Sequence, residues 1–137
     1  MSRTASRFSL LRAFRRNQEG QVAVMFGLAA LPLAAAVGAA VDYSHSNQVR
    51  TSLQKAMDAA VLAAAIDASP NWQTAAMNSF NGNLSAKDSA VGSPAFALQN
   101  DVYSGSVPAV VRTSFMSLVG IDTVPLTVNS AATLGKI

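Results

Sequence analysis

The residues able to do chemistry are few in this chain and stand far apart. His45 is the only histidine and there is no cysteine, so a zinc site of the usual histidine and thiolate ligands lacks its donors. Serines are plentiful, but one histidine and no G-x-S-x-G pattern give no support to a hydrolase triad. No glycine-rich phosphate loop is present either. We therefore expect no catalytic residue, no metal ligand and no cofactor, and we predict that the protein is not an enzyme.

The polar residues at positions 42–46 allow more than one interpretation. His45 is either a pH-sensitive or metal contact at the level of lipid head groups or a solvated polar residue, and we favour the solvated residue. Tyr43 suits the aromatic belt of a membrane interface. Asp42 is the first charged residue after a long apolar run, at the position where the chain is expected to leave the membrane. It is either a functional residue or simply the residue at the end of the apolar run. The six aspartates are scattered singly and are expected to be solvated.

The apolar run organises the rest of the chain. From Val22 to Val41 there is no charged residue, and this is the length that a helix needs to cross a bilayer core of roughly 30 Å. The domain organisation predicted from it is a basic arm (1–20), a transmembrane helix (21–41), an amphipathic helical extension (42–69) and a small α+β region (70–137). The fold class is α+β, with a long pilin-like N-terminal helix before a small head.

The charges are distributed unevenly about this run. Residues 1–19 carry five arginines against one glutamate, a net of 5 − 1 = +4, whereas residues 42–137 carry 5 − 6 = −1. Arginine beside an apolar segment marks its cytoplasmic side and also attracts anionic lipid. The basic balance therefore indicates topology and lipid contact, not nucleic acid. We expect a single-pass protein of a bacterial inner membrane, with its N-terminus in the cytoplasm and its C-terminal region in the periplasm.

A cleaved signal peptide is the competing interpretation. Small residues at 34–36 and 37–39 supply patterns of the A-x-A type at which signal peptides are cut. The alternative function is then a secreted or periplasmic binding protein released near Ala40. The run and the basic arm are both long for a signal peptide, which favours an uncleaved anchor.

Small residues and a helical stripe together predict a face for helix packing. Within the span, Ala30, Ala34 and Gly38 repeat every four residues, which allows another helix to approach closely, while Pro32 is expected to bend the helix. After the span the apolar stripe continues at helical spacing, and 21–68 should form one rod about 70 Å long, with 42–47 as its weakest segment. The predicted packing face is Ala30, Ala34, Gly38, Leu53, Ala56, Met57, Ala60 and Ala64.

The remaining residues predict a short helix and several strands. Pro70 should end the long helix, Asn71 should cap a helix over 72–80, and 81–83 should form a turn. Residues 84–94 look like a loop. We expect weak strands around 96–103, broken at Asn100-Asp101, and over 107–111. Residues 113–119 form either a helical turn or a strand that ends at Gly120. The last strand is 123–133, and Pro125 in it predicts either an edge position in the sheet or a later start of the strand.

Three separated blocks resemble a known family. They are Arg16-Asn-Gln-Glu-Gly-Gln-Val-Ala-Val-Met-Phe-Gly-Leu28, Gly38-Ala-Ala-Val-Asp-Tyr43 and Leu53-Gln-Lys-Ala-Met-Asp-Ala-Ala-Val-Leu-Ala-Ala-Ala65. Over residues 14–66 they are similar to the N-terminal region of TadE/TadG-like proteins of the tight-adherence (Flp) pilus systems. The residues from 111 onward look like the family's usual continuation.

The resemblance implies a membrane-anchored, non-enzymatic component of pilus assembly, either TadG-like and accessory or similar to a minor pilin. Its partners would be other pilus-assembly membrane proteins or pilin-like subunits, in a homo- or hetero-oligomer. Prepilin-like members carry Glu five residues after the glycine at which they are cleaved. Counted from Gly20 that position is Met25, which departs from the pattern of processed members. Processing between Gly20 and Gln21 is kept as an alternative to an unprocessed chain. Metal-dependent adhesion, known for larger TadG-like proteins with a von Willebrand factor A-type domain, is not carried over.

Overall fold

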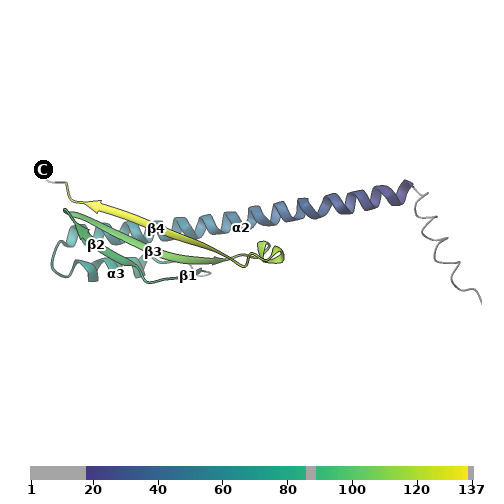
Figure 1. Cartoon of the computed structure of the whole chain (residues 1–137). Helices are drawn as coiled ribbons and strands as arrows, with labels where there is room; N and C mark the ends of the chain where they lie inside the picture. The colour runs from purple at the N-terminus through teal and green to yellow at the C-terminus, as the bar shows by residue number, and fades with distance from the viewer. Residues whose placement is uncertain (1–17, 86–88, 136–137) are drawn as a thin grey trace, which may run out of the picture. The chain divides into compact units, whose positions relative to one another are not determined.

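The computed structural model describes residues 18–85 and 89–135 (Figure 1). The predicted basic arm therefore lies almost entirely outside the described residues. The chain divides into two compact units, residues 1–38 and 39–137. In order, the elements are α2, α3, β1, β2, β3, a short 3₁₀ helix η1, and β4.

A single helix, α2 (Gln18–Asp67), runs through both units. The prediction of one continuous rod is confirmed, because the helix passes Pro32 and the polar residues 42–47 without a break. It ends where Ala68 takes a left-handed backbone conformation with φ of 44°. Its N-terminal segment is long and apolar enough to cross a membrane, and only 6% of the apolar window is buried. A core helix of a soluble protein would be mostly buried, so this segment has the exposure expected of a span.

The second helix, α3 (Trp72–Asn83), is longer than predicted. The expected turn at 81–83 is wrong, because these residues form the last helical turn, where the Asn83 side-chain amide donates to the Ser79 carbonyl at 2.8 Å. Asn71 occupies the N-cap position, but its side chain makes no capping hydrogen bond. Its backbone carbonyl accepts the Thr74 N–H at 2.8 Å instead.

All strands are antiparallel and centre on one long strand. They are β1 (Ser89–Val91), β2 (Ala95–Gln99), β3 (Val102–Arg112) and β4 (Thr123–Thr133). β4 pairs with the full length of β3 on one side, while β2 and β1 share the other side one after the other. β4 has the predicted bounds and, as Pro125 indicated, pairs with no other described strand. Figure 1 shows the β3–β4 hairpin alongside the second half of α2.

The supposed break at Asn100-Asp101 is a hairpin turn. Gln99 pairs with Val102, and the two residues between them have φ of 51° and 63°. Two successive positive φ values define the type I′ turn that joins two twisted strands, and Asn and Asp tolerate it better than most residues. The weak strand regions expected near 96–103 and 107–111 are therefore β2 and one continuous β3. The short strand β1 also lies within the segment that was expected to be a loop.

The core lies between one face of the sheet and the two helices. Alternate residues of β3 are buried, as the period of two requires, and they join residues of α2, α3 and β4 in a single cluster. The largest fully buried side chains are Phe80, Leu53, Met57, Val61, Val107, Val111 and Val128. Trp72 packs edge-on against Tyr103 with ring centroids 5.3 Å apart. The head thus has its own core, built around the stripe of α2.

Gly105 marks the closest approach of helix and sheet. A Cβ at this position would overlap the sulfur of Met57 and lie 3.1 Å from the ring of Phe96. The missing side chain lets Met57 enter the core above β3. A glycine weakens a strand interior, and here close packing accounts for it.

Candidate functional site

The predicted packing face divides between the two units. Leu53, Ala56, Met57, Ala60 and Ala64 are at most 1% exposed and pack within the head. They belong to the core cluster that the head forms with its own sheet and α3. In the first unit, Ala34 is exposed and Ala30 half-exposed, while Gly38 is buried. Contact of these small residues with another helix stays a prediction, as does processing between Gly20 and Gln21, which lie in the first turns of α2.

Asp42 is the most unusual polar residue of the described chain. It is only 4% exposed and is the one charged residue in the buried set. Its carboxylate accepts three backbone N–H groups, those of Ser114 at 2.8 Å, Phe115 at 2.9 Å and Met116 at 2.6 Å. These donors lead into η1 (Met116–Val119), and N–H groups at a helix start have no partner within the helix. The expectations of a plain boundary residue and of a solvated aspartate are therefore wrong for Asp42.

These hydrogen bonds also set the charge of the carboxyl group. Burial removes water from the carboxyl group and by itself raises the pKa of Asp42. The N–H donors of Met116, Ser114 and Phe115, with a smaller contribution from His45, lower the pKa by more than burial raises it. The net result is a pKa below the ordinary value of 3.8. Asp42 is therefore ionised at neutral pH and supplies a fixed negative charge to the three donors.

The spacing of Asp42, Ser44 and Ser46 matches D-x-S-x-S, the letter pattern of a metal-ion adhesion motif. In this structure the three side chains do not converge on one point, because residues two apart on a helix do not share a face, and Ser44 is exposed while Asp42 is buried. Both Asp42 oxygens are also occupied by N–H donors. His45 is half-buried on the same helix.

A second aspartate joins α2 to β4. The Asp58 Oδ1 atom accepts the hydroxyl of Ser130 at 2.5 Å and the side-chain amide of Gln54 at 2.8 Å. The same amide of Gln54 lies 3.2 Å from the carbonyl oxygen of Asn129 and donates to it. Asp58 is half-buried, so its expected role as a solvated loop residue is also wrong.

Both aspartates hold the helix to the β3–β4 hairpin, Asp42 at the connection between the two strands and Asp58 at Ser130 in β4. Sequence analysis missed this because their partners lie 72–74 residues further along the chain. One sequence feature could have revealed them. Asp42 and Asp58 are the acidic residues of the second and third blocks of the family resemblance, and Gln54 belongs to the third. The blocks therefore contain the residues that fasten the head to its helix.

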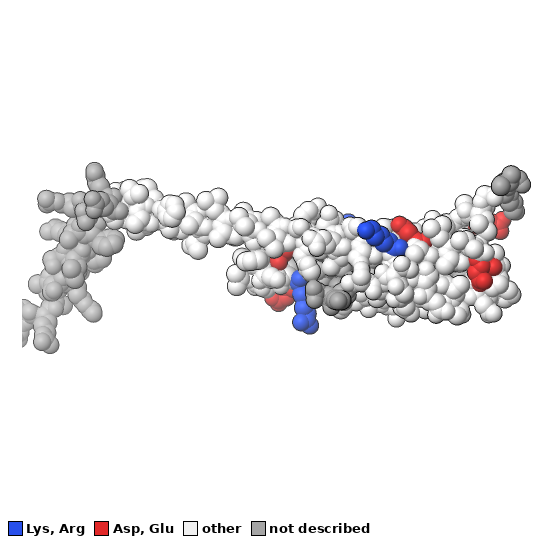
Figure 2. All heavy atoms as spheres, turned by 180° about the vertical axis from the view of Figure 1, so that it is seen from behind, with Lys and Arg blue, Asp and Glu red and all other residues white. Residues whose placement is uncertain are grey.

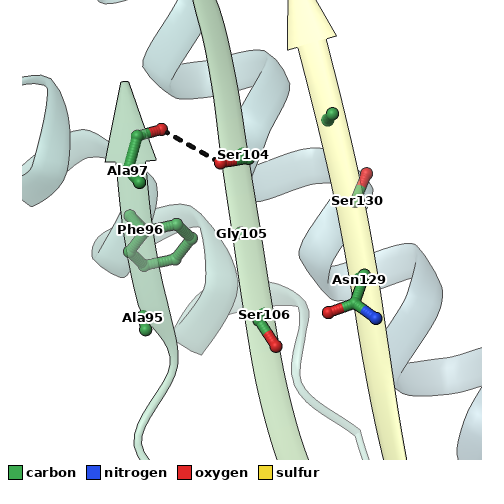
Figure 3. A pocket seen from close by; sticks show the side chains of 9 residues that line it. Ala95, Phe96, Ala97, Ser104, Gly105, Ser106, Asn129 and Ser130 are labelled. Carbon is green, nitrogen blue, oxygen red and sulfur yellow. Dashed lines mark hydrogen bonds between the residues drawn. The ribbon is translucent and has the colours of Figure 1, made fainter. Parts of the chain in front are cut away.

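The outer face of the sheet carries a shallow groove without ionisable groups (Figure 3). Its lining is Ala95, Phe96, Ala97, Ser104, Gly105, Ser106, Asn129, Ser130 and Ala131. The Ser104 hydroxyl donates to the Ala97 carbonyl at 3.3 Å. With no acid, base or activated nucleophile in its lining, the groove offers no general acid–base chemistry.

The acidic residues and the histidine of the described chain do not gather into a cluster that could hold a metal ion. Within residues 18–85 and 89–135, no three histidine, aspartate or glutamate residues come together as ligands. On the face that Figure 2 shows, a few charged side chains stand on a largely neutral surface. The polar contacts that do converge, around Asp42 and Asp58, are structural hydrogen bonds.

The structure defines a small α+β head built on the second half of a long helix whose first half has the exposure and composition of a membrane span. Residues 20–68 match the family model described as "Putative Flp pilus-assembly TadE/G-like". The match confirms the TadE/TadG-like resemblance for this segment, which is a little over a third of the chain and contains both aspartates. Comparison with curated proteins and with solved structures gave no match.

Proposed function

We propose that this protein is a membrane-anchored, non-enzymatic component of Tad/Flp pilus assembly, acting as a TadG-like accessory protein or a minor pilin-like subunit. The observation that carries the proposal is the coincidence of two features in α2. The segment that matches the pilus-assembly family is also the one that contains the exposed, uncharged run. A structural role is further supported by the family match itself, which is to a pilus-assembly domain.

The proposed topology places the arginine-rich N-terminus in the cytoplasm and the head in the periplasm. It follows from the net charge of +4 before the run and of −1 after it. The head suits exposure to water, since it buries its own apolar core and Asp42 is the one charged residue in its buried set.

The proposed partners are pilin-like subunits or other assembly proteins in the same membrane. Ala30 and Ala34 leave room for a neighbouring helix within the span, where packing rather than the hydrophobic effect drives association. The stripe beyond residue 49 is occupied by the head itself. Association of spans is therefore the proposed route to a homo- or hetero-oligomer.

Deletion and complementation in the bacterium that carries this chain test the proposal. Deletion should abolish or reduce surface pili, and the full chain should restore them. A matched variant, residues 42–137 behind a cleavable signal peptide, should fail to restore them although the head folds. Unchanged pili after deletion would overturn a role in assembly, and restoration by the released head would overturn the need for the anchor.

A further inference from the structure

Exposed apolar side chains gather in the connection between β3 and β4, residues 113–121. Leu118 is 84% exposed and Val119 69%, and Phe115 and Ile121 are each nearly half exposed. No residue from Thr113 to Ile121 is charged. A short surface loop normally carries polar residues, so this composition requires an explanation.

Most backbone donors of the 113–121 loop have a hydrogen-bond partner. Besides the three that Asp42 accepts, the N–H groups of Leu118, Gly120 and Ile121 donate to carbonyls within the loop. The Thr113 N–H donates to the Asp122 carbonyl at its edge. Gly120, with φ of 85°, closes the 3₁₀ turn.

Two of the three side-chain hydroxyl groups of the loop are also turned inward. Those of Thr113 and Ser117 donate to the carbonyls of Ile121 and Ser114. Water is scarce near the hydrocarbon of a bilayer, so a segment that enters it must satisfy its own polar groups. The 113–121 loop largely meets this condition.

The attachment of the loop to Asp42 places it at a particular level of α2. Asp42 directly follows the uncharged run, so it marks the level at which the proposed span meets the head groups. Tyr43, the next residue, is 74% exposed, and tyrosine is enriched at that level. The three hydrogen bonds hold the start of η1 beside this point.

We propose that the 113–121 loop inserts Leu118, Val119 and Phe115 into the lipid interface at the level of Asp42, as a second contact of the head with the membrane. The occupant of this apolar surface is the bilayer, because the loop is fastened where the membrane-spanning segment ends. Apolar side chains at such a surface reach about 5–10 Å into the boundary of head groups and acyl chains. The inference rests on the proposed membrane anchorage. It fixes the orientation of the head, with the β2–β3 turn at the opposite end of the sheet and away from the lipid (Figure 1).

The absence of cysteine allows a direct test on the full chain. Single cysteines replace Leu118, Leu31 in the span or Ile66, and each is labelled with a polarity-sensitive fluorophore in phosphatidylcholine vesicles. Nitroxide lipids, labelled near the head group or near the chain end, act as quenchers. Ile66 is the matched control, because it is apolar and 74% exposed but lies about 36 Å further along α2 than Asp42.

The loop probe at position 118 should be quenched severalfold more than the probe at 66, and more strongly by the shallow nitroxide than by the deep one. The probe at 31 should show the reverse depth preference. Quenching at 31 with none at 118 would overturn the loop inference and leave the anchor intact. No quenching at 31 would overturn the anchor itself, and the inference with it. Shielding at 118 without lipid quenching, lost on dilution of the protein in lipid, would show that a second copy covers the loop and would also overturn the proposal.

Discussion

The Asp42 carboxylate and the Met116 backbone N–H meet at 2.6 Å although 74 positions separate them in the sequence. This bond and its two neighbours fasten the only buried charge of the described chain to the start of η1. A buried carboxylate is stable only when its desolvation is offset by hydrogen bonds. The contact therefore explains both the aspartate after the apolar run and the folded state of the loop.

Replacing Asp42 by asparagine should loosen the loop. The amide keeps the size of the side chain but has one acceptor oxygen and no charge, so it cannot hold three N–H donors. We expect faster hydrogen exchange at Ser114, Phe115 and Met116 and a lower thermal midpoint for the full chain in detergent. Asp67→Asn is the matched control, since Asp67 is exposed and accepts only the nearby Ser69 hydroxyl. Equal exchange in the two variants would contradict this role of Asp42.

The contribution of Asp42 should depend on pH in a defined window. Its pKa in the folded protein lies below 3.8, so the folded state binds this proton less tightly than the unfolded state. The stabilisation is therefore complete above pH 3.8 and is lost as the pH falls through the folded pKa. The difference in thermal midpoint between wild type and Asp42→Asn should stay constant towards neutral pH and shrink below 3.8. A difference that grows on acidification would contradict the assigned direction.

Removing the Ser130 hydroxyl should weaken the second contact of α2 with the hairpin. We expect Ser130→Ala to lower the free energy of unfolding by about 1 kcal/mol, the typical net contribution of an intramolecular hydrogen bond. A double-mutant cycle with Asp58→Asn should show coupling, because the two side chains share this bond. Ser104→Ala, which removes an exposed hydroxyl on the outer face, should change stability by less than about 0.5 kcal/mol. Additive effects at 58 and 130 would mean that the bond contributes nothing.

Adding one methyl group at Gly105 should destabilise the head. The new Cβ would collide with Met57 and crowd Phe96, and overpacking of this kind costs about 1–3 kcal/mol. Gly82→Ala is the opposite control, because Gly82 lies in α3 with open space around it. Alanine should stabilise that position by up to about 1 kcal/mol. Equal midpoints of denaturant unfolding for the two variants would show that helix and sheet are not closely packed at Gly105.

Truncating Phe80 should cost far more than truncating Phe115. Phe80 is 1% exposed within the core cluster, so Phe80→Ala removes apolar contacts and leaves a cavity, at a cost of about 3–5 kcal/mol. Phe115 is 48% exposed, and its contact with Asp42 uses only the backbone. Phe115→Ala should therefore leave the unfolding free energy in detergent within about 0.5 kcal/mol of wild type. Similar losses for the two variants would contradict the assignment of Phe80 to the core.

The features predicted from sequence are those that local pattern controls. The charge-free run predicted the first half of α2, and the apolar stripe at helical spacing predicted the second half. Alternating residues predicted β4, and Pro125 indicated its place in the sheet. The stripe indicated burial but not what covers it, which is the chain's own sheet. Asn100-Asp101 lacks the glycine of the strongest hairpin signals, so the sequence predicts a break within one strand and not a turn between two strands.

The candidate site depends on contacts that no local pattern contains. Asp42 accepts backbone N–H groups, which every residue except proline has, so the side chains of Ser114, Phe115 and Met116 do not predict this contact. Asp58 and Gln54 do show a helical i, i+4 spacing, but Ser130 reaches them only through the β3–β4 pairing. The chemistry of the residues was evident from sequence, and their partners required the fold.

Membrane anchorage by residues 22–41 is tested by fractionation of cells that express a C-terminally tagged chain, followed by N-terminal sequencing of the mature protein. We expect a membrane-bound product that retains residues 22–41, either full-length or beginning at Gln21. A start at Gln21 would show pilin-type processing despite Met25 and would favour entry into a filament. A soluble product that begins near Ala40 would contradict the membrane anchor and with it the proposed function.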